Sequence, residues 1–200
     1  MSKIQTPLKG KLTHIITVGT TPTGVGDDVV VALATDLKDL SPRAVIVLAT
    51  EDSRDNAQRL IKLIGLPPAR GTVRVLASAQ SLDEAYQVTS DEIGKLNQAG
   101  IPSGDIVLHY TAGTKVMSAG AVLAAVGNEV LALRYLYAPG RGQASVPVTT
   151  VSAAVAADRQ MALARTLLLE QRFRTARDLA TGIDASLITP ERQEVRTLLV

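Results

Sequence analysis

The stretch that decides the fold reads Val107-Leu108-His109-Tyr110-Thr111-Ala112-Gly113-Thr114-Lys115-Val116-Met117-Ser118-Ala119-Gly120-Ala121. It begins as an apolar run rich in branched side chains, which predicts a buried strand. Small and hydroxylated residues then form a polar turn, and the apolar residues from Lys115 onward predict a helix that Thr114 caps. A strand, a tight turn and a helix in this order are typical of an α/β protein.

The turn has the features of an anion-binding site. Backbone N–H groups and the positive end of the helix dipole are offered to a ligand, and Lys115 stands beside them. A tight turn with a helix cap needs similar residues in any α/β protein, so a structural turn and a ligand site remain equally open. The spacing is not that of a P-loop, which needs a Gly five residues before Gly-Lys-Ser/Thr, and this disfavours a nucleoside triphosphate site.

Outward from this stretch, apolar β-branched runs alternate with helical patterns. Strands are predicted over residues 12–18, 43–50, 72–76, 106–108, 129–138 and 146–154, and helices over 27–40, 54–64, 81–98 and 115–126. The alternation predicts an α/β fold, a Rossmann-like three-layer sandwich with a mostly parallel sheet. The last two strands are expected to form a hairpin-like pair.

The composition changes after Ala157. Apolar residues then recur at helical spacing, which predicts a helix that ends at Gly182. A second helix is predicted to begin at Thr189-Pro190-Glu191 and to run to Val200. We therefore divide the chain into a Rossmann-like domain, residues 1–157, and C-terminal helices, residues 158–200.

The composition limits the chemistry. Cysteine is absent and there are only two histidines, so neither a disulfide nor a multi-histidine metal centre is expected, and no cofactor is predicted. One Phe, four Tyr and no Trp make a base-stacking platform hard to assemble. The net charge of +2 is spread among acidic residues, so generic binding to DNA is not expected.

Targeting signals are not evident. No signal peptide is recognised, and the longest apolar run, residues 119–127, falls far short of the ~20 residues that cross a bilayer. The expectation is a soluble cytoplasmic protein with no membrane partner.

A second loop is expected to face the first. Gly19-Thr20-Thr21-Pro22-Thr23-Gly24-Val25-Gly26 follows the first strand, but its glycines do not have the spacing of a dinucleotide fingerprint. Glycine backbone freedom alone explains them equally well. Loops after parallel strands gather at one edge of the sheet, which would bring this loop to the 111–115 turn.

Three polar residues, Asp52, Ser53 and His109, have open roles. Asp52 or Ser53 is most simply the cap of the helix beginning at Arg54, and the alternative is contact with a ligand. His109 is either a catalytic base or, as we favour, a buried hydrogen-bonded histidine.

The segment from His109 to Ser118 resembles the Asp-x-Thr-Gly-Gly-Thr-Lys-x-Met signature of CARF domains, the CRISPR-associated Rossmann-fold sensors of cyclic oligoadenylates. It departs from the signature at His109, where Asp is usual, and at Ala112, where Gly is usual. More weakly, the resemblance extends from about Thr13 to about Ser152.

The resemblance implies a homodimeric sensor of a cyclic oligoadenylate made during type III CRISPR antiviral defence, with cyclic tetra-adenylate favoured and hexa-adenylate next. Residues 158–200 would then be a connector or the start of a truncated effector domain. No catalytic residue is assigned, although slow cleavage of the bound ring is conceivable for such domains. The residues expected at the ligand are Gly19, Thr20, Thr21, Pro22, Thr23, Ser53, Thr111, Ala112, Gly113, Thr114, Lys115 and Met117.

Two other classes of protein remain open. A dinucleotide-binding Rossmann enzyme would share the architecture, but the fingerprint and a catalytic constellation are missing. A ligand-responsive transcription regulator would need a recognition helix, and residues 158–200 show no basic helix of that kind.

Overall fold

The computed structural model describes residues 12–20, 26–137, 146–183 and 196–197. The chain forms two compact units, Met1–Thr150 and Val151–Val200. Within the described residues, no helix is long and apolar enough to cross a membrane.

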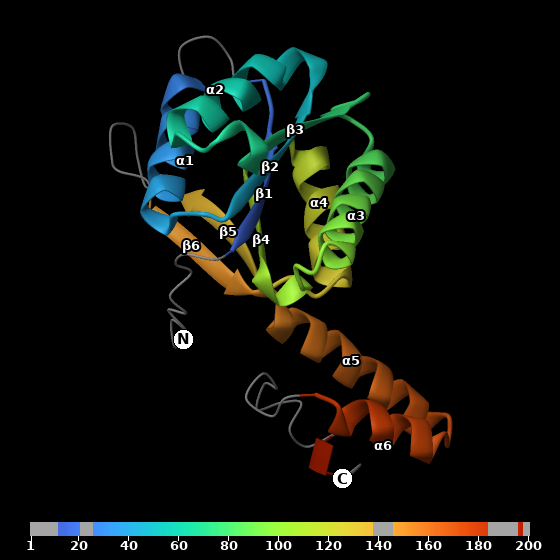
Figure 1. Ribbon diagram of the computed structural model, residues 1–200. Coiled ribbons are helices and arrows are strands. Elements are labelled where there is room, and N and C mark those ends of the chain that lie inside the picture. The colour runs from blue at the N-terminus through green and yellow to red at the C-terminus, as the bar shows by residue number, and fades with distance from the viewer. Residues whose placement is uncertain (1–11, 21–25, 138–145, 184–195, 198–200) are drawn as a thin grey trace. The chain divides into compact units, whose positions relative to one another are not determined.

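A six-stranded sheet forms the centre of the first unit (Figure 1). Its order is β3-β2-β1-β4-β5-β6, with parallel pairing from β3 through to β5, and Figure 1 draws β6 beside β5 with its arrow reversed. The bounds are β1 Thr13–Val18, β2 Ala44–Thr50, β3 Gly71–Leu76, β4 Ile106–Ala112, β5 Ala132–Tyr137 and β6 Val146–Val151. The predicted α/β fold with a mostly parallel sheet is confirmed, and the strand order reverses direction between β1 and β4.

Helices cover both faces of the sheet, as Figure 1 shows, which gives the predicted three layers. One face carries α1 Gly26–Leu40 and α2 Arg54–Ile64, and the other carries α3 Leu82–Gln98 and α4 Lys115–Gly127. Short 3-10 turns lie at Glu51–Ser53, Pro68–Arg70 and Ser103–Asp105. Because both faces are covered, β1 is buried along its whole length, with Ile15 in one core and Ile16 in the other.

The ends of several elements differ from the prediction. The strand expected to reach Ala154 ends at Val151, and α5 Ser152–Leu169 begins at once, because Ala-rich sequence favours a helix. The fifth strand was predicted to begin at Glu129, but β5 begins at Ala132. Glu129 has a φ of +53°, a left-handed backbone conformation that does not fit a strand.

The C-terminal helical pattern is divided in two. Gln171, with φ of +62°, separates α5 from α6 Phe173–Thr181, yet Ala164 and Ala176 of the two helices share one small core. The pattern therefore continues across the break because both helices bury their apolar faces together. The further helix predicted from Thr189 lies outside the described residues, apart from 196–197.

Close packing of α3 on α4 depends on Gly120. A Cβ atom at this position would lie 2.5 Å from the Leu82 carbonyl oxygen and 2.9 Å from the Ala85 Cβ. A backbone oxygen cannot move aside cheaply, so only glycine allows the two helices to approach this closely.

We expect Gly120→Ala to lower the free energy of unfolding by ~1–3 kcal/mol, because the added methyl group forces the helices apart. Gly127→Ala, in the same helix, is the matched control, since the nearest atom to its Cβ is the Tyr86 hydroxyl at 3.9 Å. Urea denaturation measures both variants. Equal stabilities would show that the α3–α4 contact is not tight.

Candidate anion-binding site at the switch point

The two loops predicted to meet at the sheet edge are in contact. The Gly19 N–H donates a hydrogen bond of 2.6 Å to the Ala112 carbonyl oxygen, which joins the end of β1 to the end of β4. Thr20 is exposed beside it, and the Asn56 side chain donates to the Gly19 carbonyl at 3.4 Å. Thr21, Pro22 and Thr23 lie outside the described residues.

Gly113 is required by the close approach of β1. A Cβ here would lie 2.6 Å from both Cβ and Oγ1 of Thr17 and 2.9 Å from the Ser118 hydroxyl. The Ser118 hydroxyl donates at 3.2 Å to the Tyr110 carbonyl, which fixes the first turn of α4 against β4. Gly113 therefore lets the turn lie directly over Thr17.

Thr114 caps α4 as predicted. Its hydroxyl accepts from the Met117 N–H at 3.2 Å and donates to the Ala79 carbonyl at 2.7 Å. The second bond brings the loop after β3 to the turn, and the Glu84 carboxylate holds that loop by accepting from the N–H groups of Ala77 and Ser78. Sequence analysis missed this third loop, because nothing local shows that it reaches Thr114.

Lys115 is exposed at the start of α4, with no hydrogen-bond or ion-pair partner among the residues that the structure describes. The N–H groups of Lys115 and Val116 precede any intrahelical acceptor, as in the first turn of every α-helix. A cationic side chain, free amide groups and the positive helix end thus converge on one point, and this arrangement suits an anion.

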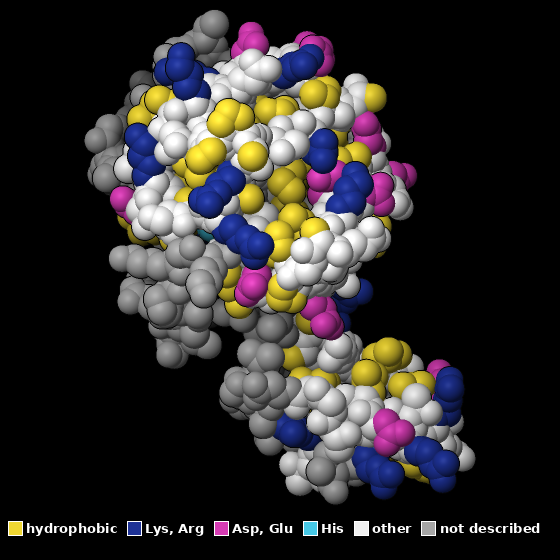
Figure 2. Space-filling view, in the orientation of Figure 1, with side chains coloured by type: hydrophobic (Ala, Val, Ile, Leu, Met, Phe, Trp, Pro, Cys, Tyr) yellow, Lys and Arg dark blue, Asp and Glu magenta, His cyan; other side chains and the backbone are white. Residues whose placement is uncertain are grey.

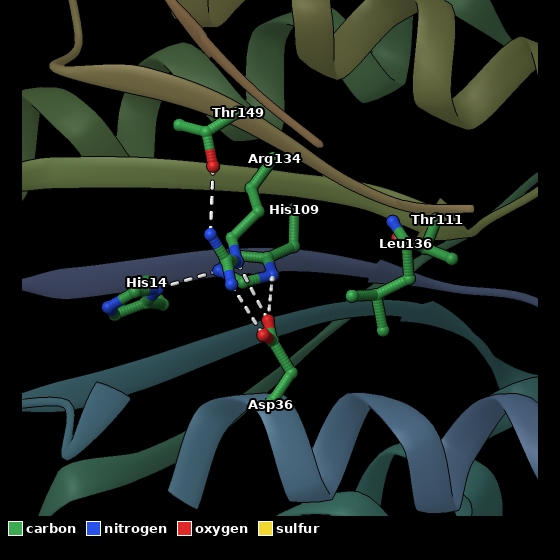
Figure 3. A network of polar contacts seen from close by, with 7 residues as sticks. All are labelled: His14, Asp36, His109, Thr111, Arg134, Leu136 and Thr149. Atoms are coloured by element: carbon green, nitrogen blue, oxygen red, sulfur yellow. Dashed lines mark hydrogen bonds and ion pairs between the residues drawn. The ribbon is translucent and has the colours of Figure 1, made fainter. Parts of the chain in front are cut away.

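Thr111 and Met117, which were also predicted at the ligand, make contacts within the fold. Thr111 accepts a hydrogen bond of 2.9 Å from the Leu136 N–H, which ties β4 to β5 (Figure 3). Met117 is 1% exposed and lies in the core between α4 and the sheet. Neither group points freely to solvent.

Ser53 is fully buried and occupies the N-cap position of α2, as predicted, but its side chain makes no cap hydrogen bond to that helix. Its hydroxyl accepts from the Thr50 N–H at 2.9 Å and contacts the Val18 carbonyl oxygen at 2.9 Å. The cause is the 3-10 turn at Glu51–Ser53, in which Thr50 and Ser53 form the reciprocal capping pair one turn earlier.

A buried polar network lies on the α1 face of the same strands (Figure 3). The Arg134 guanidinium forms a bidentate ion pair with Asp36 and donates to the Thr149 hydroxyl at 2.8 Å. His109 Nε2 lies 2.7 Å from His14 Nδ1, and His109 Nδ1 lies 4.0 Å from the Asp36 carboxylate. The favoured interpretation of His109 as a buried, hydrogen-bonded histidine is confirmed.

Both imidazoles are held neutral. Burial, with the Arg134 charge as a second cause, lowers the pKa of His14 to about 3. Burial lowers the pKa of His109 well below its ordinary value, and His14 and Arg134 lower it further. Because both rings are neutral, one imidazole donates and the other accepts the hydrogen bond between His14 Nδ1 and His109 Nε2.

These shifts predict that acid destabilises the fold. The unfolded chain takes up protons near pH 6.5 and the folded histidines do not, so the free energy of unfolding falls as the pH drops from about 6.5 towards 4.5. Each histidine contributes on the order of 1 kcal/mol per pH unit. Urea unfolding between pH 7.5 and 4.5 measures the slope.

His14→Gln is expected to reduce that slope, because one of the two neutral imidazoles is removed. NMR of the histidine ring protons supplies an independent check on the unaltered protein. A ring that titrates with a midpoint near 6.5 while the protein stays folded would contradict the prediction.

Among the described residues, no group of three or more His, Cys, Asp or Glu side chains could hold a metal ion. Figure 2 shows Lys and Arg side chains dispersed among Asp and Glu over the face in view.

The strand order and the turn at its switch point define a Rossmann-like α/β domain with a candidate anion site. No protein-family model and no curated protein matches the chain. Among solved structures, Enterococcus italicus Csm6 bound to cyclic hexa-2'-fluoro-hexa-dAMP matches with a TM-score of 0.65 and 12% identity, over 94% of this chain and 53% of that one. The chain thus spans about half the length of Csm6, and the two proteins share a fold.

Two further structures show weaker similarity. Can2 from Sulfobacillus thermosulfidooxidans, in complex with cyclic tetra-adenylate, has a TM-score of 0.48 and 15% identity over 95% of this chain and 57% of that one. A type III CRISPR defence DNA nuclease activated by cyclic oligoadenylate has a TM-score of 0.49 and 13% identity over 96% of this chain and 34% of that one.

Proposed function

We propose that this chain is the sensor domain of a cytoplasmic type III CRISPR effector and that it binds a cyclic oligoadenylate, with cyclic tetra-adenylate favoured over hexa-adenylate. The observation that carries the proposal is the junction of Gly19 with the 111–115 turn at the switch point, where Lys115 and the α4 amides suit a phosphate. A C-terminal effector would respond to the ligand.

The fold supports this ligand class. Csm6, which shares the fold, was solved with a cyclic hexanucleotide analogue, and the 109–118 segment resembles the CARF signature. The glycines of the sequence lack the spacing of a dinucleotide fingerprint. On the face seen in Figure 2, Lys and Arg side chains are dispersed among acidic ones and form no continuous basic surface. Direct contact with DNA forms no part of the proposal.

A homodimer fits such a ligand, because a ring of identical units is best read by a two-fold symmetric receptor. The outer face of α4 offers a surface for it. Lys115 is the only charged residue in α4, and Ala119 and Leu123 are exposed on the helix, the latter by 51%. A helix that is apolar all round is normally covered, and a second copy would cover this one beside the ligand turn.

Lys115→Ala is expected to weaken binding of cyclic tetra-adenylate at least tenfold, roughly 1.4 kcal/mol, because a charge-assisted phosphate contact is lost. Lys62→Ala removes the same charge from an exposed position at the end of α2 and serves as the control. Calorimetry against cyclic tetra- and hexa-adenylate and NAD(H) measures the affinities. Unchanged affinity of a folded Lys115→Ala protein would remove this lysine from the site.

We also expect the bound ring to stay intact, or to be cleaved only slowly. The one imidazole close in sequence to the turn, His109, is fully buried and hydrogen-bonded to His14, so it cannot reach a ribose hydroxyl. Chromatography of cyclic tetra-adenylate after several hours with excess protein provides the test. Rapid conversion to linear fragments would contradict a pure sensor.

A further inference from the structure

The fold gathers three of the four tyrosines onto two neighbouring strands. Tyr110 lies in β4, and Tyr135 and Tyr137 lie in β5. The rings of Tyr110 and Tyr135 are stacked, with centroids 5.4 Å apart and an interplanar angle of 29°. Both rings are half-buried and Tyr137 is 51% exposed, so solvent reaches the cluster.

The tyrosine cluster lies beside the ligand turn. Leu108 pairs with Leu133 and His109 with Arg134, and the stacked rings of Tyr110 and Tyr135 follow directly after these pairs toward the carboxyl edge. Leu108 and Leu133 belong to the core under α3 and α4, and alternation along each strand places the tyrosines on that same face. Ser118 in the first turn of α4 bonds the Tyr110 carbonyl, which brings the start of α4 to this pair.

We propose that Tyr110, Tyr135 and Tyr137 form a subsite for the purine base of the ligand, next to the phosphate site at Lys115. The inference rests on the proposed function, because a nucleotide must place a base within a few ångströms of its phosphate. Aromatic faces bind bases of any sequence by stacking. Burial and the neighbouring Tyr135 raise the pKa of Tyr110, so its hydroxyl stays protonated and can donate to a ring nitrogen at neutral pH.

Four tyrosines and no tryptophan make intrinsic fluorescence a direct probe of this cluster. Cyclic tetra-adenylate is titrated into the full chain while tyrosine emission and, in parallel, heat are recorded. We expect quenching on binding. Tyr135→Leu should lose at least fivefold in affinity along with most of the quenching, whereas Tyr135→Phe should keep the affinity with a smaller quenching amplitude.

Tyr86→Leu is the matched control, because Tyr86 is the tyrosine outside the cluster, on α3. It should leave the affinity unchanged. If Tyr135→Leu fails to fold, Tyr137→Leu, at an exposed position, and Tyr135→Phe still test the subsite through affinity and quenching amplitude.

The outcomes separate the two proposals. Binding by the unaltered chain with no quenching, and no loss in Tyr135→Leu or Tyr137→Leu, overturns the subsite and leaves the sensor function standing. Absence of binding to any cyclic oligoadenylate overturns both. A Tyr135→Leu protein that loses self-association but keeps its affinity assigns the cluster to a protein interface and also overturns the subsite.

Discussion

The pairing of β1 with β4 is the constraint on which the rest of the structure depends. Ile16 pairs with His109, but Val18 pairs with Ala112, so β4 carries one additional residue between these pairs. This irregularity is a β-bulge. A β-bulge changes the direction in which nearby side chains point, and bulges are common next to active sites. It places His109 and Ala112 on the same face of the sheet and returns the end of β4 to Gly19, where the Gly19–Ala112 hydrogen bond closes the junction.

The two faces of these central strands consequently have different chemistry. On the α1 face, a neutral histidine pair and a matched Asp36–Arg134 ion pair leave no net charge buried, which meets the requirement for burying ionisable groups. On the α4 face, apolar residues give way to tyrosines near the carboxyl edge. The charges on the α1 face are thereby balanced, whereas Lys115 presents an unbalanced positive charge at the edge of the sheet.

Local sequence signals predicted most of the fold and the turn itself. The strands, the helices and the Thr114 cap follow from periodicity and capping, which depend on neighbours in the sequence. The contacts that are hard to predict from the sequence join residues far apart in the chain. His14 contacts His109 across 95 positions, and Asp36 contacts Arg134 across 98. The stacking of Tyr110 on Tyr135 is another contact between distant residues, and composition alone does not indicate it. All the ligand contacts predicted from the sequence stay predictions, and Thr21, Pro22 and Thr23 lie outside the described residues.

The acidic residues that follow β2 limit where a phosphate can bind along the carboxyl edge of the sheet. Glu51 and Asp52 are exposed directly after β2, and Glu51 is paired with Arg54 at 3.0 Å, whereas Asp52 keeps its charge toward solvent. Like charges repel over distances comparable to the Debye length, about 8–10 Å at ordinary ionic strength, so an anion is disfavoured beside β2. Lys115 and the α4 dipole attract it on the other side of β1. The edge is therefore polarised, with its anion-accepting half over β1 and β4 and its acidic half at the end of β2.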